Sequence, residues 1–392
     1  MSRRVVWLLA ISTGCIVANI YYAQPLLADM AHEFDLSVPQ IGAVAMLAQI
    51  GSAVGMLLFV PLGDKHERRG LIAALLVAGA VAMAATASAQ SVLWLCVGSI
   101  AVGCTTANVH VIVPLAAHLA PPQQRGRVVG TVLGGLLVGV LLARTFSGVV
   151  GAQYGWRIVY WIGATVMIVL AVVIRVALPV SQPEESPRWS ELMRSIVGLV
   201  REHAVLREAA VLAFLMYSTF TALWTTLVFL LRTPPYHYGT TAAGTFGLLG
   251  AASASAAPIV GRFSDRYGPR RAVMIALVTT LVAYVILLGA GRTMPGLIAA
   301  IILIDAGVQS GHVANQSRIY ALVPTARGRL NTVYMMAFML GGAVGSYVGP
   351  LGFKVGGWFG FCAYPIVALS MALAFMSFAR RQVVARPTSH VA

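Results

Sequence analysis

The sequence is poor in charge, and especially in negative charge. Only 10% of its 392 residues are charged, and 12 acidic residues stand against 27 basic ones. Hydrophobic residues make up 59% of the chain, compared with about 45–50% in soluble domains. Such a chain cannot cover its outside with polar side chains, so we expect the lipid bilayer to be its main solvent.

Cysteine pairs and the short motifs of enzymes are missing as well. Cys15, Cys96, Cys104 and Cys362 are scattered through apolar runs without a CxxC pair, which argues against disulfides and a metal site. The sequence contains no HExxH, no GxSxG and no nucleotide-binding loop. We therefore predict neither an intramembrane enzyme nor a protein driven by ATP, and we expect no cofactor.

What the chain has in abundance is apolar segments of membrane-spanning length. Each runs for about 18–27 residues, enough to cross a hydrocarbon core of about 30 Å. The first continues to about Met30, so we expect a retained helix and not a cleaved signal peptide. The twelve predicted spans are 5–30, 39–61, 71–89, 92–118, 128–152, 156–178, 208–231, 240–260, 272–290, 295–322, 330–352 and 359–379.

The positive charges lie in short loops between these spans and form no continuous basic face, so we expect no nucleic-acid partner despite a net charge of +15. With both termini in the cytoplasm, twenty of the Lys and Arg residues fall on the cytoplasmic side and four on the other. This bias predicts that orientation for a multi-pass protein of a bacterial inner membrane.

One long connection, from Pro179 to about Arg207, divides the chain near its middle. It begins as a Pro- and Glu-rich loop and continues with apolar residues at helical spacing, interrupted by Arg194 and Arg201. This pattern favours a basic amphipathic helix on the inner membrane face, and a solvated linker is the alternative. The predicted domains are an N-terminal bundle (1–180), a cytoplasmic linker (181–207) and a C-terminal bundle (208–392).

The two halves also match each other residue by residue, at offsets of 201 or 202 positions. The matches are Asp64 with Asp265, Pro122–Arg127 with Pro324–Arg329, Gly155-Trp156 with Gly357-Trp358, and His110 with His312. They indicate an internal duplication of six helices. We therefore predict an all-α membrane protein of two six-helix bundles, related by a pseudo-two-fold axis along the membrane normal around a midplane site. A monomer suffices for this arrangement.

A dense block of charge follows the second predicted helix of each half. The second block contains Gly261, Asp265, Arg266, Gly268, Arg270 and Arg271, and the first contains Asp64, Lys65, Arg68 and Arg69. A carboxylate at a helix end can pair with nearby arginines and with the positive N-terminus of an adjacent helix.

The second block resembles the G-x-x-x-D-R-x-G-x-R-R signature of the major facilitator superfamily, and the chain is similar to that family over its whole length. The first block has Val60 and Glu67 where the family has glycines, so we expect its turn to differ. The resemblance implies that these charges latch the inner side when the transporter opens outward. The alternative is that they only fix the orientation of the chain.

The chain resembles most the proton-coupled drug and sugar exporters of this family. Gly98 stands where those exporters carry an arginine in helix 4. Helix 5 keeps their glycines but lacks the proline and contains Arg144. The expected function is proton-coupled antiport that exports a drug-like molecule, a sugar or a metabolite. The alternative is a proton symporter or facilitator for uptake of a sugar or an organic anion.

Acidic residues within spans are rare, and each needs a reason because a charge in lipid costs about 2.5–3.5 kcal/mol. Asp305 lies about 15 Å into its helix, and Gln309, His312 and Gln316 continue the same face. We expect this polar face to line the cavity, with Gln309 and Gln316 as candidates for substrate contact. We hypothesise that Asp305 binds the coupling proton and that His312 relays it or contacts substrate. A neutral, hydrogen-bonded structural carboxyl is the alternative. His110, the repeat mate of His312, is a weaker candidate of the same kind.

Arg144 and Asp29 lie toward the outer ends of two helices that are neighbours in this family. They form either a structural ion pair or, for Arg144, a contact to an anionic substrate. Asp29 is also a candidate for proton coupling. Polar and aromatic residues on the first and seventh helices are further candidates for the cavity wall, with simple packing as the alternative. These are Asn19, Tyr21, Tyr22, Gln24, Tyr217 and Trp224.

Overall fold

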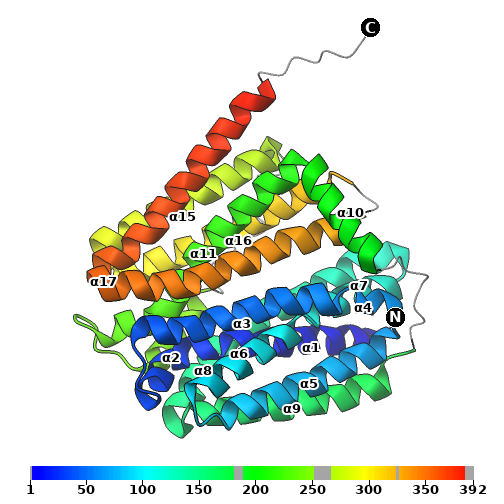
Figure 1. Cartoon of the computed structure of the whole chain (residues 1–392), viewed down its shortest axis with the longest axis horizontal. Helices are drawn as coiled ribbons and strands as arrows, with labels where there is room; N and C mark the ends of the chain where they lie inside the picture. Colours follow the sequence, from blue (N-terminus) through cyan, green and yellow to red (C-terminus); the bar gives the residue numbers. More distant parts are fainter. Residues whose placement is uncertain (1, 181–188, 251–265, 324–325, 385–392) are drawn as a thin grey trace. The chain divides into compact units, whose positions relative to one another are not determined.

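A computed structural model describes residues 2–180, 189–250, 266–323 and 326–384 (Figure 1). Over these ranges the chain is helical, without strands. The helices pack into two compact units, which are described separately: 1–192 with 224–248, and 193–223 with 249–392. Helix α11 begins in the second unit and ends in the first. The predicted division at 180 and 208 stays a prediction, and residues 181–188 lie outside the described ranges.

The first unit consists mainly of long helices that run side by side (Figure 1). Gln40 caps the start of α3, since its Oε1 accepts hydrogen bonds from Ser37 N at 2.9 Å and from Ser37 Oγ at 2.6 Å. Glu67 begins α5 by accepting a hydrogen bond from Gly70 N at 2.9 Å. The helices are α1 (Arg3–Tyr21), α2 (Ala23–Glu33), α3 (Val38–Phe59), α4 (Leu62–Lys65), α5 (Arg68–Ala87), α6 (Val92–Thr106), α7 (Val109–Leu119), η1 (Pro122–Gln124), α8 (Arg125–Tyr154), α9 (Trp156–Ala177), α12 (Thr240–Thr245) and η2 (Phe246–Leu248).

The second unit holds most of α10 (Trp189–Glu202) and of α11 (Ala204–Arg232), with α15 (Pro269–Ala290), α16 (Met294–Tyr320) and α17 (Arg327–Val384). Within α17 the backbone leaves the helical conformation at Gly356 and Gly357. Two helices therefore meet there, as the predicted spans 330–352 and 359–379 require.

Ten helical segments within the described ranges are long and apolar enough to cross a membrane. The last of them, Arg327–Ser377, contains the two helices that meet at Gly356. The predicted span 240–260 falls largely on residues 251–265, which lie outside the described ranges. The other predicted spans are each found as a helix or, where a span breaks near its middle, as two consecutive helices.

Two spans of the first unit are broken in this way. The first breaks at Tyr22, between α1 and α2, and the other at Ala107 and Asn108, between α6 and α7. The buried Asn108 side chain donates a hydrogen bond from Nδ2 to the carbonyl of Ile72 at 3.1 Å. Irregular backbone at membrane depth is tolerated where polar groups find such partners within the protein.

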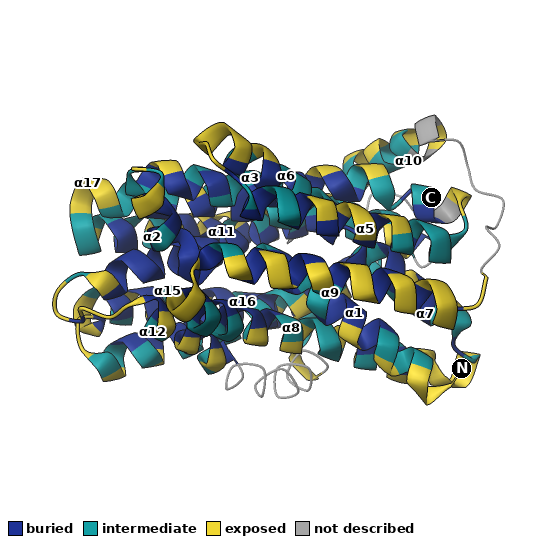
Figure 2. Ribbon diagram, turned by 90° about the horizontal axis from the view of Figure 1, so that it is seen from below, coloured by how far each residue is buried: buried dark blue, intermediate teal, exposed yellow. Residues whose placement is uncertain are grey.

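Exposed and buried residues share the same helices (Figure 2), and many of the exposed ones are large and apolar. Val81 on α5 is 63% exposed, and Val176 on α9 is 81% exposed, whereas Leu76 and Ile174 on the same two helices are buried. Contiguous apolar surface of this kind is unfavourable in water but matches lipid tails. The exposed faces therefore identify α5 and α9 as membrane-spanning helices.

Glycines at matching positions of the predicted repeat share an unusual backbone conformation. Gly155 ends α8 with φ +84°, and Gly357 separates the two parts of α17 with φ +56°. Positive φ is accessible to glycine without steric penalty. A tryptophan follows each glycine and begins the next helix, so this part of the predicted duplication recurs in the backbone geometry.

Candidate functional site

Arg144 is a buried cation in the first unit, only 1% exposed. Its Nε donates a hydrogen bond to Gln24 Oε1 at 2.7 Å. Its guanidinium lies 3.7 Å from the ring centroid of Trp224 and 5.1 Å from that of Tyr21. Aromatic rings stabilise a cation placed over their faces. Three residues predicted for the cavity wall, from α1, α2 and α11, thus meet around one arginine of α8.

The recess beside this cluster is closed. It is lined by Gln24, Pro25, Arg144, Trp224, Leu227, Val228 and Ala243, and it leaves no room for a water molecule. A Cβ on Gly148 would come within 2.6 Å of Gly244 Cα, so α8 and α12 meet here backbone to backbone. Small residues allow such close approach between membrane helices.

The face of α8 that carries Arg144 changes from exposed to buried along its length. Residues spaced by three, four or seven positions share one face of a helix. On this face Gly130, Leu133 and Leu137 are exposed, whereas Arg144 and Gly148 are buried. Arg144 is therefore the first charged side chain beyond the exposed, apolar part of the face.

Asp29, near the end of α2, forms an ion pair with Arg232 at the end of α11. Its second oxygen accepts a hydrogen bond from Thr240 Oγ1 at 2.7 Å, and Arg232 also donates to that hydroxyl at 3.0 Å. The suggested pairing of Asp29 with Arg144 is therefore wrong. Arg232 directly follows the predicted seventh span, at the same predicted outer side of the membrane as Asp29.

Asp305 lies in the eleventh position after the start of α16 and is 4% exposed. It is close enough to Tyr284 of α15 for the two groups to interact electrostatically. Gln309, His312 and Gln316 follow on the same face and are half-buried. The polar stripe predicted from the sequence thus faces protein over much of its surface, with Asp305 as its most buried member.

The C-terminal part of the polar stripe, His312 and Gln316, contacts the first of the two helices within α17. His312 Nδ1 lies 3.1 Å from the hydroxyl of Tyr334, and Gln316 Nε2 donates to Asn331 Oδ1 at 3.3 Å. Sequence reasoning missed these partners. Asn331 and Tyr334 are three residues apart in a predicted span, a spacing that places them on one helical face and was a usable signal.

Tyr217 of α11 joins the same region through an aromatic ring of α17. It stacks on Phe338 at a centroid distance of 3.6 Å, and the His312 ring lies 4.7 Å from Phe338. An imidazole, a phenol and a phenyl ring therefore form a continuous patch beside the polar stripe of α16. Such a mixture of apolar wall and a few hydrogen-bonding groups suits a small ligand.

The remaining candidate residues are His110, Asn19 and Tyr22. His110 is half-buried on α7, directly after the break at Ala107 and Asn108. His312 lies within an unbroken helix, so the two repeat mates have different surroundings. Asn19 and Tyr22 are buried, and the ring of Tyr22 packs 5.7 Å from that of Phe146.

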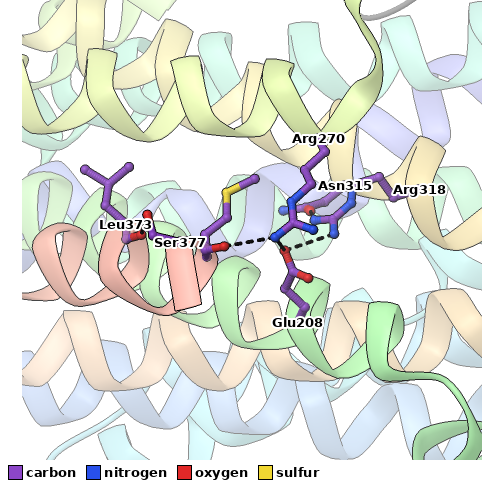
Figure 3. A network of polar contacts seen from close by, with 7 residues as sticks. Glu208, Arg270, Asn315, Arg318, Leu373 and Ser377 are labelled. Atoms are coloured by element: carbon purple, nitrogen blue, oxygen red, sulfur yellow. Dashed lines mark hydrogen bonds and ion pairs between the residues drawn. The ribbon is translucent and has the colours of Figure 1, made fainter. Parts of the chain in front are cut away.

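The two charge blocks make one equivalent contact. In the first unit Arg69 Nη1 donates to the carbonyl of Leu178 at 3.3 Å. In the second, Arg270 Nη2 donates to the carbonyl of Met376 at 2.9 Å and lies 3.5 Å from Glu208 Oε1 (Figure 3). Each arginine thus ties the start of one helix to the end of the last helix of its half.

The other members of the blocks lie around these contacts. Arg68 Nε donates to the Gly63 carbonyl at 2.9 Å. Lys65, Arg266 and Arg271 are exposed. Gly261 and Asp265 lie outside the described residues, as does the side chain of Asp64.

The predicted difference between the two turns is confirmed. Gly268 precedes α15 with φ +87°, a conformation that favours glycine. Glu67, at the matching position, has φ −57° and uses its carboxylate to cap α5. A side chain is therefore tolerated in the first turn because its backbone takes a different path.

The comparison with known proteins agrees with this architecture. The Major Facilitator Superfamily profile matches residues 9–288 and 210–391. The chain is 37% identical over 362 residues to the uncharacterized transporter YgaY of Escherichia coli O157:H7, covering 92% of each protein. It is 38% identical over 360 residues to the probable transporter SCO4007 of Streptomyces coelicolor, covering 91% of this chain and 83% of that one.

Among solved structures, the fold is similar to a bacterial homologue of the human lysosomal transporter Spinster, in its inward-facing and unoccupied conformation. The TM-score is 0.77 at 16% identity, over the whole of both chains. The chain therefore belongs to the major facilitator superfamily. It is an all-α, multi-pass membrane transporter, and no observation points to catalysis.

Proposed function

We propose that this transporter is a proton-coupled antiporter that exports a small molecule from the cytoplasm by alternating access. It resides in the bacterial inner membrane with both termini in the cytoplasm, acts as a monomer and uses the proton gradient without a cofactor. Asp305 binds the coupling proton. The alternative, uptake of a sugar or an organic anion, is decided by the first experiment below.

The observation that carries the proposal is the burial of Asp305 near the middle of a membrane helix. A carboxylate at this depth is unfavourable when charged and is retained where it serves a function. Its protonated form is neutral and suited to a buried site, so a change between exposed and buried states alters its affinity for protons. His312, about two turns further along α16, and the hydroxyl of Tyr334 on α17 lie 3.1 Å apart and extend the polar stripe that begins at Asp305.

Alternating access is supported by the contrast along α8. In the predicted orientation, the buried end of its Arg144 face lies on the outer side, where Asp29 and Arg232 also pair. The exposed end lies on the cytoplasmic side. We propose that the Asp29–Arg232 pair and the Gly148–Gly244 contact close the outer end in this state and separate in the other one. Asp29 is accordingly a gating residue and not a proton carrier.

Deletion of the gene, followed by a broad screen of toxic compounds and metabolites, tests the direction of transport. Gained sensitivity to a compound, reversed by the intact gene, is expected for an exporter. Loss of growth on a nutrient would instead indicate uptake and would contradict the proposal.

The role of Asp305 is tested in proteoliposomes with the compound that the screen identifies. A pH-sensitive dye inside the vesicles reports proton movement when the compound is added outside. We expect Asp305→Asn to abolish this movement while the compound still binds, and the exposed Glu202→Gln to keep it. Undiminished proton movement in Asp305→Asn would make Asp305 a structural residue.

A further inference from the structure

Helix α10 is attached to two membrane helices near the level at which each of them begins. Only His203 separates α10 from α11, which is long and apolar enough to cross a membrane. Arg207, in the first turn of α11, donates from Nη1 to two carbonyls in the last turn of α10 at 2.8 and 2.6 Å, and so caps that helix. Arg329, in the first turn of α17, donates to the hydroxyl of Ser195 on α10. These contacts hold α10 at the surface of the bilayer.

Two arginines form a line along the exposed face of α10. Successive residues of a helix are rotated by about 100°, so Arg194 and Arg201, seven positions apart, lie on one line along it. Both are exposed. One flank of this line is apolar, since Val197 is 48% exposed and Met193 and Val200 are half-buried. The helix therefore places positive charge directly beside an apolar strip.

The other flank of the arginine line is acidic. Glu191 and Glu202 are exposed there, and Ser195 on the same flank binds Arg329 of α17. The surface of α10 thus changes from apolar through basic to acidic around the helix. In a helix that lies along a bilayer, apolar side chains enter the acyl boundary and arginines extend to the headgroups, while the polar flank stays in water. The acidic residues are therefore on the side that faces away from lipid.

We propose that α10 lies in the headgroup layer of the inner leaflet and binds anionic phospholipids through Arg194 and Arg201. Their guanidinium groups pair with phosphate oxygens, and Val197 enters the boundary with the acyl chains. In the predicted orientation α10 faces the cytoplasmic leaflet, and basic segments beside membrane helices are attracted to anionic lipids there. This partner differs from the transported molecule, so the interaction goes beyond the proposed transport function.

The experiment places a fluorescent label on the apolar flank and measures which lipid lies next to it. Val197→Cys carries the fluorophore NBD in the full-length protein, whose four native cysteines are replaced by serine. The protein is placed in phosphatidylcholine nanodiscs, and increasing fractions of nitroxide-labelled phosphatidylglycerol or phosphatidylcholine quench the label. We expect the relative association constant to favour phosphatidylglycerol about 25-fold, since each arginine near the surface contributes about a factor of 5.

Variants show whether the arginines set this preference. Arg194→Gln or Arg201→Gln alone should reduce it to about 5-fold, and the two changes together should abolish it. Arg194→Lys should keep it, and Arg292→Gln, exposed in the loop between α15 and α16, should not alter it. A label at Glu202→Cys, on the acidic flank, should be quenched less by both lipids than the label at position 197. The thermal unfolding temperature of each variant shows that it is folded.

Three results would overturn the proposal. They are a label at position 197 that neither lipid quenches, which would place α10 against water or a protein partner, equal quenching by the two lipids when both arginines are present, and an unchanged preference when both are replaced. The measurement needs neither a substrate nor a proton gradient, and both leaflets of the nanodisc have the same composition. Its outcome is therefore independent of the coupling, direction and orientation proposed above.

Discussion

Glu208 is a buried carboxylate at the start of α11 whose charge is held by two arginines from other helices. Its Oε1 lies 3.0 Å from Arg318 Nη2 and 3.5 Å from Arg270 Nη2, and Arg318 Nη1 donates to Asn315 Oδ1 at 3.0 Å (Figure 3). The network connects α11, α15 and α16. A buried charge of this kind is stable only while its partners remain in place.

We predict that Glu208→Gln destabilises the protein by about 3–5 kcal/mol, because it leaves the buried Arg318 and the partly buried Arg270 without their shared carboxylate. The measurement is thermal unfolding of the purified protein in detergent, with the exposed Glu202→Gln as the matched control. The double variant Glu208→Gln with Arg318→Gln should lose less than the sum of the single variants, since the pair is coupled. Equal unfolding temperatures for Glu208→Gln and Glu202→Gln would show that the network adds no stability.

Single residues also show where sequence reasoning reaches its limit. The sequence identified Asp29, Arg144 and Asp305 as charges that needed an explanation, because each stands within an apolar run. It could not assign their partners. Asp29 binds Arg232, which is 203 positions away in the chain, and this choice depends on which helix ends meet.

At the scale of elements, α8 contains two adjacent glycines in opposite environments. A Cβ on Gly135 would lie 2.9 Å from Ala10 Cα, closer than real Cβ atoms come, whereas a Cβ on Gly134 meets nothing within 4 Å. The two residues therefore separate the role of close packing from the general effect of glycine on a helix.

We predict that Gly135→Ala destabilises the protein by about 1–3 kcal/mol, because the added methyl group pushes α8 away from α1. Gly134→Ala should be neutral or slightly stabilising, since alanine is the better helix former by up to about 1 kcal/mol. Thermal unfolding of the two variants beside the wild type measures the difference. The prediction fails if Gly134→Ala is the more damaging change.

The breaks within helices were not predicted from the sequence. The spans 5–30 and 92–118 read as continuous apolar runs, yet α1 ends at Tyr21 and α6 at Thr106. Pro25 lies close to the first break and is a local signal for it. The second break contains no proline, and there Asn108 is held by the carbonyl of Ile72 on another helix, a contact that only the packed unit provides.

At the scale of the whole molecule, the distribution of positive charge predicts the orientation in the membrane. Lys and Arg residues near the ends of helices remain on the cytoplasmic side. Both termini and the connection that contains α10 should lie there. The loop between α11 and α12, with Tyr236 and Tyr238, should lie outside.

Fusion proteins test this orientation. Green fluorescent protein folds in the cytoplasm and alkaline phosphatase outside the inner membrane. We expect fluorescence from a fusion after Val384, and phosphatase activity from a fusion after Tyr238. The reverse pattern would contradict the orientation and would exchange the outer and inner sides in the proposed transport cycle.

The sequence by itself determined the membrane class, nearly all of the spans and the duplication, down to the glycine turns at Gly155, Gly268 and Gly357. These properties depend on hydrophobicity, charge and backbone freedom, which act between residues that are close in the chain. The tertiary structure alone decided that Arg144 stacks on Trp224, that Asp29 binds Arg232 and that Glu208 is held by Arg318. A charge buried in an apolar protein takes the partner that helix packing brings within hydrogen-bonding distance, and that distance is not encoded by spacing along the chain.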